Sequence, residues 1–386
     1  MSILVCGSGI VGLASALALA RAGQQVALLG PRKPVPPAGE LYHPRVYAIS
    51  PASQAFLAEL GAWDALPAGR IAEVQSMDVR GDAGGRVLLH AWQAARAQMA
   101  WIVEAGEIER ALAQAVQIRG IEWIAEHYAS YEQGELITAS GRRLRPELTV
   151  AADGARSALR AAAGVRAEAR PYDAVGLVTH LDARLAHGGC AFQWFREDGV
   201  LALLPLPDTA QGAQVSMVWS MKAEPARALQ ALPAGEQARV LTERLAQATG
   251  GVLGELAPRQ PLLGFDLTLE SSAMIGERLA LVGDAAHRVH PLAGQGLNLG
   301  LADAKALAQA VAGREAFRPA GDPRVLRRYR RARAEPVLAM SLATDGLQQL
   351  FDAPWGLARW LRNAGMHGVE RLPWVKRQLI ARASEQ

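Results

Sequence analysis

The sequence predicts an α/β fold that combines a Rossmann-like dinucleotide-binding domain with a second domain built on a mixed β-sheet. Three observations carry this prediction. A glycine-rich turn at residues 7–12 follows an apolar strand, an Asp-Gly pair follows a strand at residues 148–154, and a buried strand ends in Asp284. The chain has 386 residues, which is long for one compact core, so we expect two domains.

The composition is that of an ordinary globular protein. Half of the residues are hydrophobic and 20% are charged, and the net charge of +4 is too small to indicate a nucleic-acid partner. The two cysteines cannot build a disulfide framework, which favours a reducing cytoplasm. The apolar N-terminus lacks the basic start of a signal peptide, and we expect no membrane-spanning helix because no stretch of about 20 residues is uniformly apolar.

The first motif is a strand, a glycine turn, a helix and a second strand. Residues 3–6 read as a buried strand, LASALALARAG (13–23) as a helix and QQVALLG (24–30) as a strand. In the G-x-G-x-x-G turn, Gly7 permits the tight bend, Gly9 lets the backbone approach a pyrophosphate, and Gly12 lets the helix pack on the strand. The spacing alone is a weak signal that a merely structural turn would also explain. The complete βαβ frame favours dinucleotide binding.

One position departs from this pattern. The second strand should end in Asp or Glu, which accepts hydrogen bonds from a ribose, but it ends in Gly30. Glu40 could fold back to replace the carboxylate, or the contact is absent. We favour absence, because the prolines of PRKPVPPAGE (31–40) stiffen the route back from Glu40.

Two further motifs place polar residues at strand ends. In LTVAADGARSALR (148–160) a strand runs into Asp153, although Asp-Gly is also ordinary turn chemistry. In LALVGD (279–284) a buried strand delivers Asp284 to the sheet edge where open α/β sheets bind ligands. Glycines at 294, 296 and 300 then allow close backbone approach, and Asn298 opens an apolar helix whose N-terminus favours negative charge.

Together, in this order, the three motifs resemble the class A flavoprotein monooxygenases, which bind FAD. HPLAGQGLNLGLAD (290–303) is similar to the signature of the ubiquinone-biosynthesis hydroxylase (UbiH/UbiF-like) family. This resemblance implies a glutathione-reductase type FAD-binding domain with a p-hydroxybenzoate-hydroxylase-like substrate domain. Further matches run along the chain at PRVYAISPAS (44–53), QWFREDGVLALLPL (193–206), VWS (218–220) and LQQLF (347–351).

The resemblance also implies a set of site residues. Asp284 would contact the ribityl chain, Arg45 would lie near the cofactor, and Asp153 would belong to a motif shared by FAD and nicotinamide contacts. Pro291 would lie beside the isoalloxazine ring, and Pro291 and His290 are the candidates for the catalytic set. The expected cofactor-binding residues are Gly7, Gly9, Gly12, Arg45, Asp153, Gly283, Asp284, Pro291, Gly294, Gln295, Gly296 and Asn298.

The histidines do not indicate a metal. His287 and His290 are three residues apart, but a zinc site needs at least three protein ligands and no cysteine or acidic cluster lies nearby. We therefore expect no metal. His287 is expected to hydrogen-bond to the backbone and His290 to shape the turn before Pro291, with an acid–base role left open.

Two segments rich in arginine allow two interpretations each. RVLRRYRRARAEP (324–336) reads as a solvated helix face, with phosphate or anionic-lipid binding as the alternative. WGLARWLRNAGMHGVERLPWVKRQLIARA (355–383) mixes Trp, Leu and Arg in an amphipathic pattern. It reads equally well as a lid packed on the core or as a contact with a membrane surface or a lipid tail.

The motifs divide the chain into interleaved segments. MDVRGDAGGRVLLH (77–90) reads as a hairpin, and AFQWF, VLALLPL and AQVSMVW read as strands of a mixed sheet that covers the flavin. The expected FAD-binding segments are 1–70, 95–172 and 265–340, the expected substrate segments are 71–94 and 173–264, and 341–386 is expected to form a helical lid.

These expectations describe an aromatic hydroxylase with tightly bound FAD. By resemblance it would use NAD(P)H and O₂, act through a flavin C4a-hydroperoxide, and hydroxylate a polyprenylated phenol or quinol in ubiquinone biosynthesis. One alternative is a small soluble aromatic substrate, and the other is a catalytically idle accessory flavoprotein. Two departures from the family pattern keep the second alternative open, Gly30 in place of an acidic residue and Ala105 where the family often has Asn. We expect no nucleic-acid partner and a cytoplasmic location. Peripheral contact with the inner membrane or with a biosynthetic complex stays open.

Overall fold

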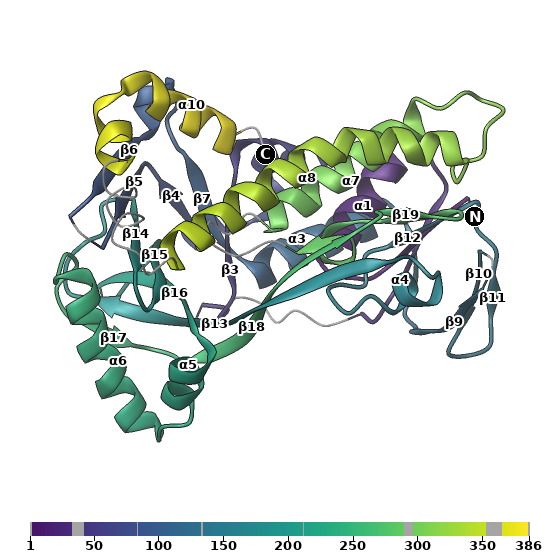
Figure 1. The fold of residues 1–386 in the computed structure, drawn as a ribbon. Helices are drawn as coiled ribbons and strands as arrows, with labels where there is room; N and C mark the ends of the chain where they lie inside the picture. The colour runs from purple at the N-terminus through teal and green to yellow at the C-terminus, as the bar shows by residue number, and fades with distance from the viewer. Residues whose placement is uncertain are drawn as a thin grey trace.

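The structure is a computed structural model that describes residues 2–32, 42–82, 84–132, 134–210, 212–288, 296–352 and 365–384. Within these residues the strands form four sheets, two of them large (Figure 1). One large sheet is mostly parallel and combines strands from the start, the middle and the later part of the chain, and the other is mixed. The fold is therefore the α/β architecture with a second, mixed sheet that the sequence predicts.

The parallel sheet has the strand order β19-β20-β12-β1-β2-β8. Its pairs are parallel except for β19 with β20. The three central strands are buried along their whole length because their residues are apolar or small, as is typical of parallel sheets covered on both faces. The strands are β1 (Ile3–Cys6), β2 (Val26–Leu29), β8 (Glu122–Ile124), β12 (Leu148–Ala151), β19 (Ile275–Gly276) and β20 (Leu279–Leu281).

Helices cover this sheet and join it to the rest of the chain. α1 packs against α7 and α3, and Figure 1 shows the long α8 running beside α7. Ser50 caps α2 by accepting a hydrogen bond from the Ser53 amide at 3.2 Å, with proline at the first helical position. These helices are α1 (Ile10–Arg21), α2 (Pro51–Glu59), α3 (Ala105–Ile118), α4 (Ala158–Ala162), α7 (Gly296–Ala312) and α8 (Pro323–Asp352).

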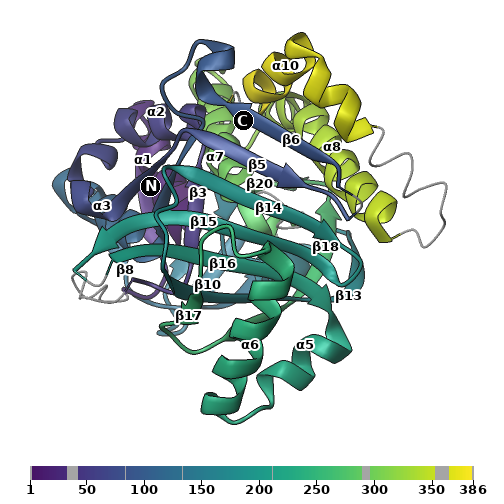
Figure 2. The same ribbon diagram turned by 90° about the vertical axis from the view of Figure 1, so that its left-hand side faces the viewer.

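The mixed sheet has nine strands in the described chain, in the order β21-β18-β13-β16-β15-β14-β5-β6, with β17 paired to β13. Figure 2 shows α5 and α6 together at one end of it and α10 at the other, beside β6. Its elements are β5 (Ser76–Arg80), β6 (Arg86–His90), β13 (Ala167–Ala183), β14 (Cys190–Arg196), β15 (Gly199–Thr209), β16 (Gly212–Lys222), α5 (Ala223–Gln230), α6 (Ala234–Thr249), β17 (Leu256–Pro258), β18 (Leu263–Ser272) and β21 (His287–Arg288).

Smaller elements complete the described chain. A three-stranded sheet, β3-β7-β4, lies between the two large sheets, and a second one, β11-β10-β9, flanks the parallel sheet. The C-terminal helix α10 packs on the short helix η3. Their bounds are β3 (Val46–Ile49), η1 (Trp63–Ala65), η2 (Ala68–Arg70), β4 (Ile71–Val74), η3 (Ala91–Ala94), β7 (Ala100–Glu104), β9 (Tyr128–Glu132), β10 (Glu135–Thr138), β11 (Arg143–Leu144), η4 (Gly283–Ala285) and α10 (Pro373–Ser384).

The local elements expected from the sequence are present. The βαβ start is confirmed by β1, α1 and β2, and the hairpin at 77–90 by the antiparallel pair β5–β6. The domain boundaries stay a prediction. The mixed sheet extends beyond residues 173–264, since β13 begins at Ala167 and β18 ends at Ser272, and α8 continues through the expected boundary at residue 340.

Candidate functional site

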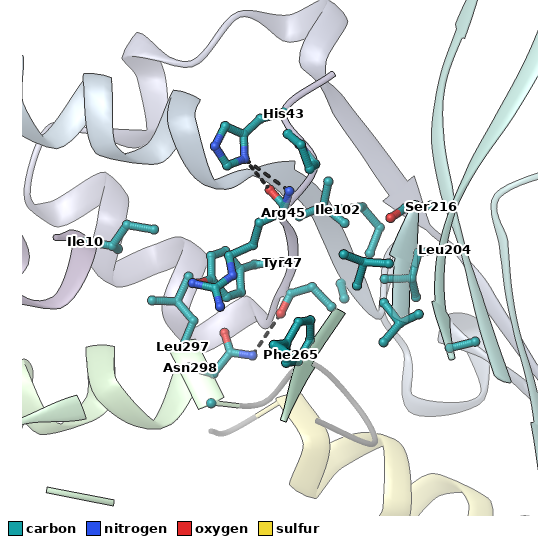
Figure 3. A pocket seen from close by; sticks show the side chains of 18 of the residues that line it. Ile10, His43, Arg45, Tyr47, Ile102, Leu204, Ser216, Phe265, Leu297 and Asn298 are labelled. Carbon is teal, nitrogen blue, oxygen red and sulfur yellow. Dashed lines mark hydrogen bonds between the residues drawn. The ribbon is translucent and has the colours of Figure 1, made fainter. Parts of the chain in front are cut away.

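A cavity of about 1120 Å³ lies between the carboxyl edge of the parallel sheet and the mixed sheet. Backbone and polar side chains line its first end, and apolar side chains line the second. Figure 3 shows the two ends: Arg45 and Tyr47 point toward Leu297 and Asn298, while Leu204 and Ser216 project from strands of the mixed sheet. The site is therefore built where the two large sheets meet.

The glycine turn at residues 7–12 is as tight as the motif predicts. A Cβ at Gly12 would lie 1.9 Å from the Gly7 carbonyl oxygen, and one at Gly7, where φ is +124°, would lie 2.1 Å from the Ala152 carbonyl oxygen. A Cβ at Gly9 would meet nothing within 4 Å, because Gly9 faces the cavity. The turn thus forms a backbone cradle at the start of α1, where amide groups of a helix N-terminus favour an anion.

Asp153 follows β12 directly beside this turn. Its Oδ2 accepts a hydrogen bond from the Leu159 amide at 3.2 Å, while Oδ1 is buried and has no partner among the described residues. Burial, and then the negative charge of Asp153, raises the pKa of Cys6 at the end of β1. A buried carboxylate oxygen without a donor is costly. The residues that line the cavity include Ala152 and Gly154 but not Asp153, so the expected contact of Asp153 with a cofactor stays a prediction.

Arg45 and Tyr47 line the part of the cavity that faces Leu297 and Asn298 (Figure 3). The Arg45 guanidinium carbon lies 6.0 Å from the centre of the Tyr47 ring, and both residues line the cavity. Burial raises the pKa of the Tyr47 hydroxyl, with the charge of Arg45 opposing and that of Asp284 assisting. Arg45 thus lines the cavity, and its expected place near a cofactor stays a prediction.

The turn after β20 presents Asp284 to the cavity. Gly283 has a φ of +59°, which glycine adopts without strain, and Asp284 is exposed while its neighbours in the turn are buried. Asn298 also lines the cavity, but its side chain is engaged by protein. Its Oδ1 accepts from the Ser50 amide at 3.1 Å and its Nδ2 donates to the Ala48 carbonyl at 2.9 Å, so it ties α7 to β3 and α2.

The expected backbone partner of His287 is wrong. His287 Nε2 lies 2.7 Å from Oδ2 of Asp303, and both side chains are buried. The helix at residues 324–336 does present the expected solvated face, with Arg324, Arg327, Arg330 and Arg331 exposed. Its other face is buried and contains Leu326, Tyr329 and Arg333. Residues three and seven positions after Leu326 share its side of the helix, and that side packs on α7.

Four expected site residues, His290, Pro291, Gly294 and Gln295, lie outside the described residues, and their roles stay predictions. Gly296 is the first residue of α7 and lines the cavity. Glu40, the proposed substitute for the missing ribose carboxylate, also lies outside the described chain.

Gly30 is packed against Ser8 in the glycine turn at residues 7–12. Its carbonyl accepts a hydrogen bond from Trp123 Nε1 at 2.9 Å, and a Cβ would lie 3.1 Å from the Ser8 amide nitrogen. A glutamate at this position would have to displace Ser8. Restoring the carboxylate at residue 30 is therefore expected to disturb the turn rather than to add a ribose contact.

The second end of the cavity is an apolar face of the mixed sheet. The register pairs Ala202 with Val218 and with Gln193, and Val218 with Val178, so these side chains form one row across four strands. A second row contains Leu204 and Ser216. The alternate residues Leu201 and Leu203 belong to the core beneath α5 and α6. Because successive side chains alternate between faces, the apolar run VLALLPL contributes Ala202 and Leu204 to the cavity lining.

The sequence motifs did not identify three residues that lie in the site or directly beneath it. Glu109 of α3 lines the cavity, and Asp303 and Arg333 form a buried ion pair below Asp284. Two signals were available. Asp303 is an acidic residue in the apolar helix LGLADAKALA, and Arg333 lies seven residues after Leu326 on the same helix face.

The chain is similar to known flavoproteins over its length. Residues 1–341 match the FAD binding domain family. Ubiquinone hydroxylase UbiL of Rhodospirillum rubrum is 34% identical over 99% of this chain and 89% of that protein, and the 3-demethoxyubiquinol 3-hydroxylase of Escherichia coli is 30% identical over 98% and 97%. The crystal structure of PqsL, a probable FAD-dependent monooxygenase from Pseudomonas aeruginosa, shares the fold, with a TM-score of 0.77, 22% identity and coverage of 95% of this chain and 99% of that one.

The cavity fits the cofactor that these similarities indicate. A backbone cradle at the start of α1 suits a pyrophosphate, and Asp284 presents an exposed carboxylate to the cavity. The volume exceeds that of an ordinary small-molecule pocket, which is about 300–1,000 Å³. The chain belongs to the FAD-binding family of ubiquinone-biosynthesis hydroxylases and is an FAD-dependent monooxygenase.

Proposed function

We propose that this enzyme hydroxylates the aromatic ring of a polyprenylated phenol or quinol in ubiquinone biosynthesis, with NAD(P)H and O₂ as co-substrates. The observation that carries the proposal is one continuous cavity with a polar, backbone-lined end and a long apolar end. The polar end suits the cofactor, and the apolar rows on the mixed sheet suit a ring with a hydrocarbon tail. The named relatives that act on ubiquinone precursors support the same substrate class.

In this proposal each element has a physical task. The amides at the start of α1 hold the pyrophosphate between Gly7 and Gly12, and Asp284 accepts hydrogen bonds from the ribityl hydroxyls. Arg45 contacts the cofactor from the cavity wall, and Asp153 acts from the end of β12 beside the glycine turn. The backbone at Gly283 and at Gly294, Gln295 and Gly296, and the N-terminal turn of α7 at Asn298, complete the cofactor site, with Pro291 and His290 beside the reacting ring.

The cofactor supplies the redox chemistry, and the protein supplies a pocket of fitting shape that excludes water. When bound and reduced by NAD(P)H, FAD activates O₂ for transfer of one oxygen atom, by the route expected from the sequence. Val178, Ala202 and Val218 keep water from the reacting centre, which matters because water diverts activated oxygen from the substrate.

The test measures cofactor and turnover together. The flavin released from the purified protein is identified by mass spectrometry, and NAD(P)H-dependent O₂ uptake is followed with a prenylated phenol, with its short-tailed analogue and with no substrate. We expect FAD, O₂ uptake stimulated by the prenylated phenol, and a product heavier by one oxygen. Preference for the short analogue would favour a soluble aromatic substrate, and FAD without stimulated uptake would favour an accessory flavoprotein.

Asp284→Ala is expected to weaken FAD binding by about 10- to 150-fold, because a hydrogen bond to a charged group contributes about 1.5–3 kcal/mol. The carboxylate is exposed in the cavity, so its removal should leave the folded protein intact. The FAD dissociation constant of the apoprotein is measured by fluorescence titration. Asp64→Ala, which removes an exposed carboxylate outside the cavity, is the control. Equal affinity in Asp284→Ala and wild type would remove Asp284 from the cofactor site.

We further propose that α10 contacts the surface of an anionic membrane, the location from which a prenylated substrate enters. None of the described helices is long and apolar enough to cross a bilayer. Trp374 and Leu379 of α10 are 67% and 46% exposed, and Arg377 and Arg382 are exposed beside them. Apolar and cationic side chains on one exposed helix suit an interface with anionic lipid. Ala383, near the C-terminal end of the same helix, lines the cavity, so α10 adjoins the site.

Trp374→Ala combined with Leu379→Ser is expected to lower binding to vesicles of mixed anionic and zwitterionic lipid by about 100-fold, because each apolar side chain loses about 1.5 kcal/mol of burial. Cosedimentation measures the effect. The control is Phe317→Ala, since Phe317 is 79% exposed but belongs to the segment between α7 and α8. Unchanged binding in the double variant would leave α10 as a structural lid.

A further inference from the structure

A cluster of buried charged side chains lies directly beneath the Gly283–Ala285 turn. Asp303 of α7 is 0% exposed, His287 of β21 is 3% exposed, and Arg333 of α8 is 6% exposed. These three residues come from three different elements. They lie behind the cavity wall rather than in it, since the residues lining the cavity include Asp284 but none of the three.

Both oxygens of the Asp303 carboxylate are occupied. Oδ2 accepts from the Gly283 amide at 2.9 Å and faces His287 Nε2 at 2.7 Å. Oδ1 accepts from Arg333 Nε at 2.7 Å, and Arg333 also donates to the Leu299 carbonyl at 3.2 Å. One carboxylate therefore joins the turn, β21 and α8 to α7.

The carboxylate is held in its ionised form. Burial opposes ionisation, but the charge and hydrogen bonds of His287 and Arg333 outweigh it and lower the pKa of Asp303. Buried ion pairs of this kind contribute little to net stability, because desolvation offsets their attraction. Stability alone is therefore a weak reason for placing three charged side chains here, and a role in geometry accounts better for them.

The turn cannot move independently of the other elements of the site. A Cβ at Gly300 of α7 would lie 2.7 Å from Val11 of α1 and 3.1 Å from the Gly283 Cα. At the other end of the turn, Arg160 donates to the Ala285 carbonyl at 2.8 Å. Backbone of α7, the turn and the start of α1 are thus in close contact, so a shift of Gly283 would also displace the phosphate cradle.

We propose that Asp303, held by His287 and Arg333, is a positioning residue that fixes the Gly283–Ala285 turn and so aims Asp284 at FAD. This inference rests on the proposed contact between Asp284 and the cofactor. It assigns to a residue outside the cavity a share of the FAD affinity and of the reduction potential of the bound flavin. Both depend on the exact placement of the turn.

Asp303→Asn is the first test. Asparagine keeps the size of the side chain, but its amide group is a donor, so either the Gly283 amide or Arg333 loses its acceptor. The expected result is FAD binding at least tenfold weaker in titrations of the apoprotein, with a changed flavin reduction potential in the fraction that retains FAD. Asp78→Asn is the matched control, because Asp78 is 2% exposed and accepts hydrogen bonds from Arg80 and Arg86 in the mixed sheet. It should lower the unfolding temperature without changing FAD affinity.

A double-mutant cycle with Asp284→Ala separates positioning from general destabilisation. If Asp303 acts by aiming Asp284, then Asp303→Asn should weaken FAD binding by a smaller factor in the Asp284→Ala background than in the wild type, although the unfolding temperature falls as before. Full additivity of the two losses, or an equal loss of affinity in Asp78→Asn, would overturn the positioning role. If Asp284→Ala itself leaves FAD affinity unchanged, the proposed Asp284 contact fails instead.

A second variant keeps the test decisive if Asp303→Asn does not fold. His287→Gln retains a donor of similar reach toward Asp303 and leaves the Arg333 ion pair intact. It should fold and weaken FAD by less than Asp303→Asn, while His287→Ala should weaken it more than His287→Gln. Equal FAD affinity and equal reduction potential in wild type and His287→Ala would contradict the proposal.

Discussion

Gly12→Ala should abolish FAD retention in the purified protein. The added Cβ would lie 1.9 Å from the Gly7 carbonyl oxygen, a backbone atom that cannot rotate away, and 3.3 Å from the Ala152 Cβ. α1 would therefore have to move away from the phosphate turn. Overpacking of this kind costs about 1–3 kcal/mol in stability. The displaced helix N-terminus would also lose its contacts with the pyrophosphate, so FAD should bind at least about 100-fold more weakly.

Two other glycines provide the controls for this prediction. Gly235 of α6 has no atom within 4 Å of an added Cβ, so Gly235→Ala should change neither stability nor FAD content. Gly9 has equal space in the protein alone, but it lines the cavity. Gly9→Ala should therefore leave the apoprotein as stable as wild type while weakening FAD. Visible absorbance and thermal unfolding measure both quantities, and normal FAD content in Gly12→Ala would refute the role of the cradle.

Ala202→Trp should lower kcat/KM for a prenylated substrate by about 100-fold or more while FAD remains bound. Ala202 lies in the middle of the cavity-facing row on β15, between Gln193 and Val218. An indole ring there would fill the apolar end that the ring and tail of the substrate need, and a substrate that cannot reach its reactive geometry loses most of its rate. The phosphate cradle is formed by other elements, so the cofactor should stay.

The same substitution on an exposed strand gives the control. Ala257→Trp on β17 adds the same bulk to the same sheet, away from the cavity, and should leave kcat/KM unchanged. Steady-state O₂ uptake and product analysis measure the difference. If Ala202→Trp turned over the prenylated substrate at the normal rate, the substrate would have to bind elsewhere.

The sequence predicted the parts of the site whose signals are local. The spacing of Gly7, Gly9 and Gly12, the strand before them and the helix after them lie within one short segment, so their geometry follows from backbone sterics. The carboxyl ends of β12 and β20 were identified in the same way, since a buried strand followed by Asp153 or Asp284 needs no knowledge of distant residues. The short distances from a Cβ at Gly7 or Gly12 to backbone atoms show that the glycine turn is as tight as its spacing predicts.

Other parts of the site could not be predicted from the sequence, because they depend on contacts between residues far apart in the chain. The partner of His287 was misassigned because Asp303 lies 16 residues away, one helix further on. Arg333 lies 30 residues from Asp303 in a run of arginines, and its spacing from Leu326 could indicate burial but not its partner. The place of Gly30 against Ser8 was also hidden, because it depends on how closely two loops of the parallel sheet approach each other.

By itself, the sequence determined the fold class, the dinucleotide-binding start of the chain and the kind of cofactor, because glycine spacing and strand-end carboxylates express these within a few residues. The tertiary structure alone decided which side chains meet. It set the register that aligns Val178, Gln193, Ala202 and Val218 in one row, and the helix packing that buries Arg333 against Asp303. Such contacts join residues far apart in the chain, and register and packing, rather than local preference, bring them together.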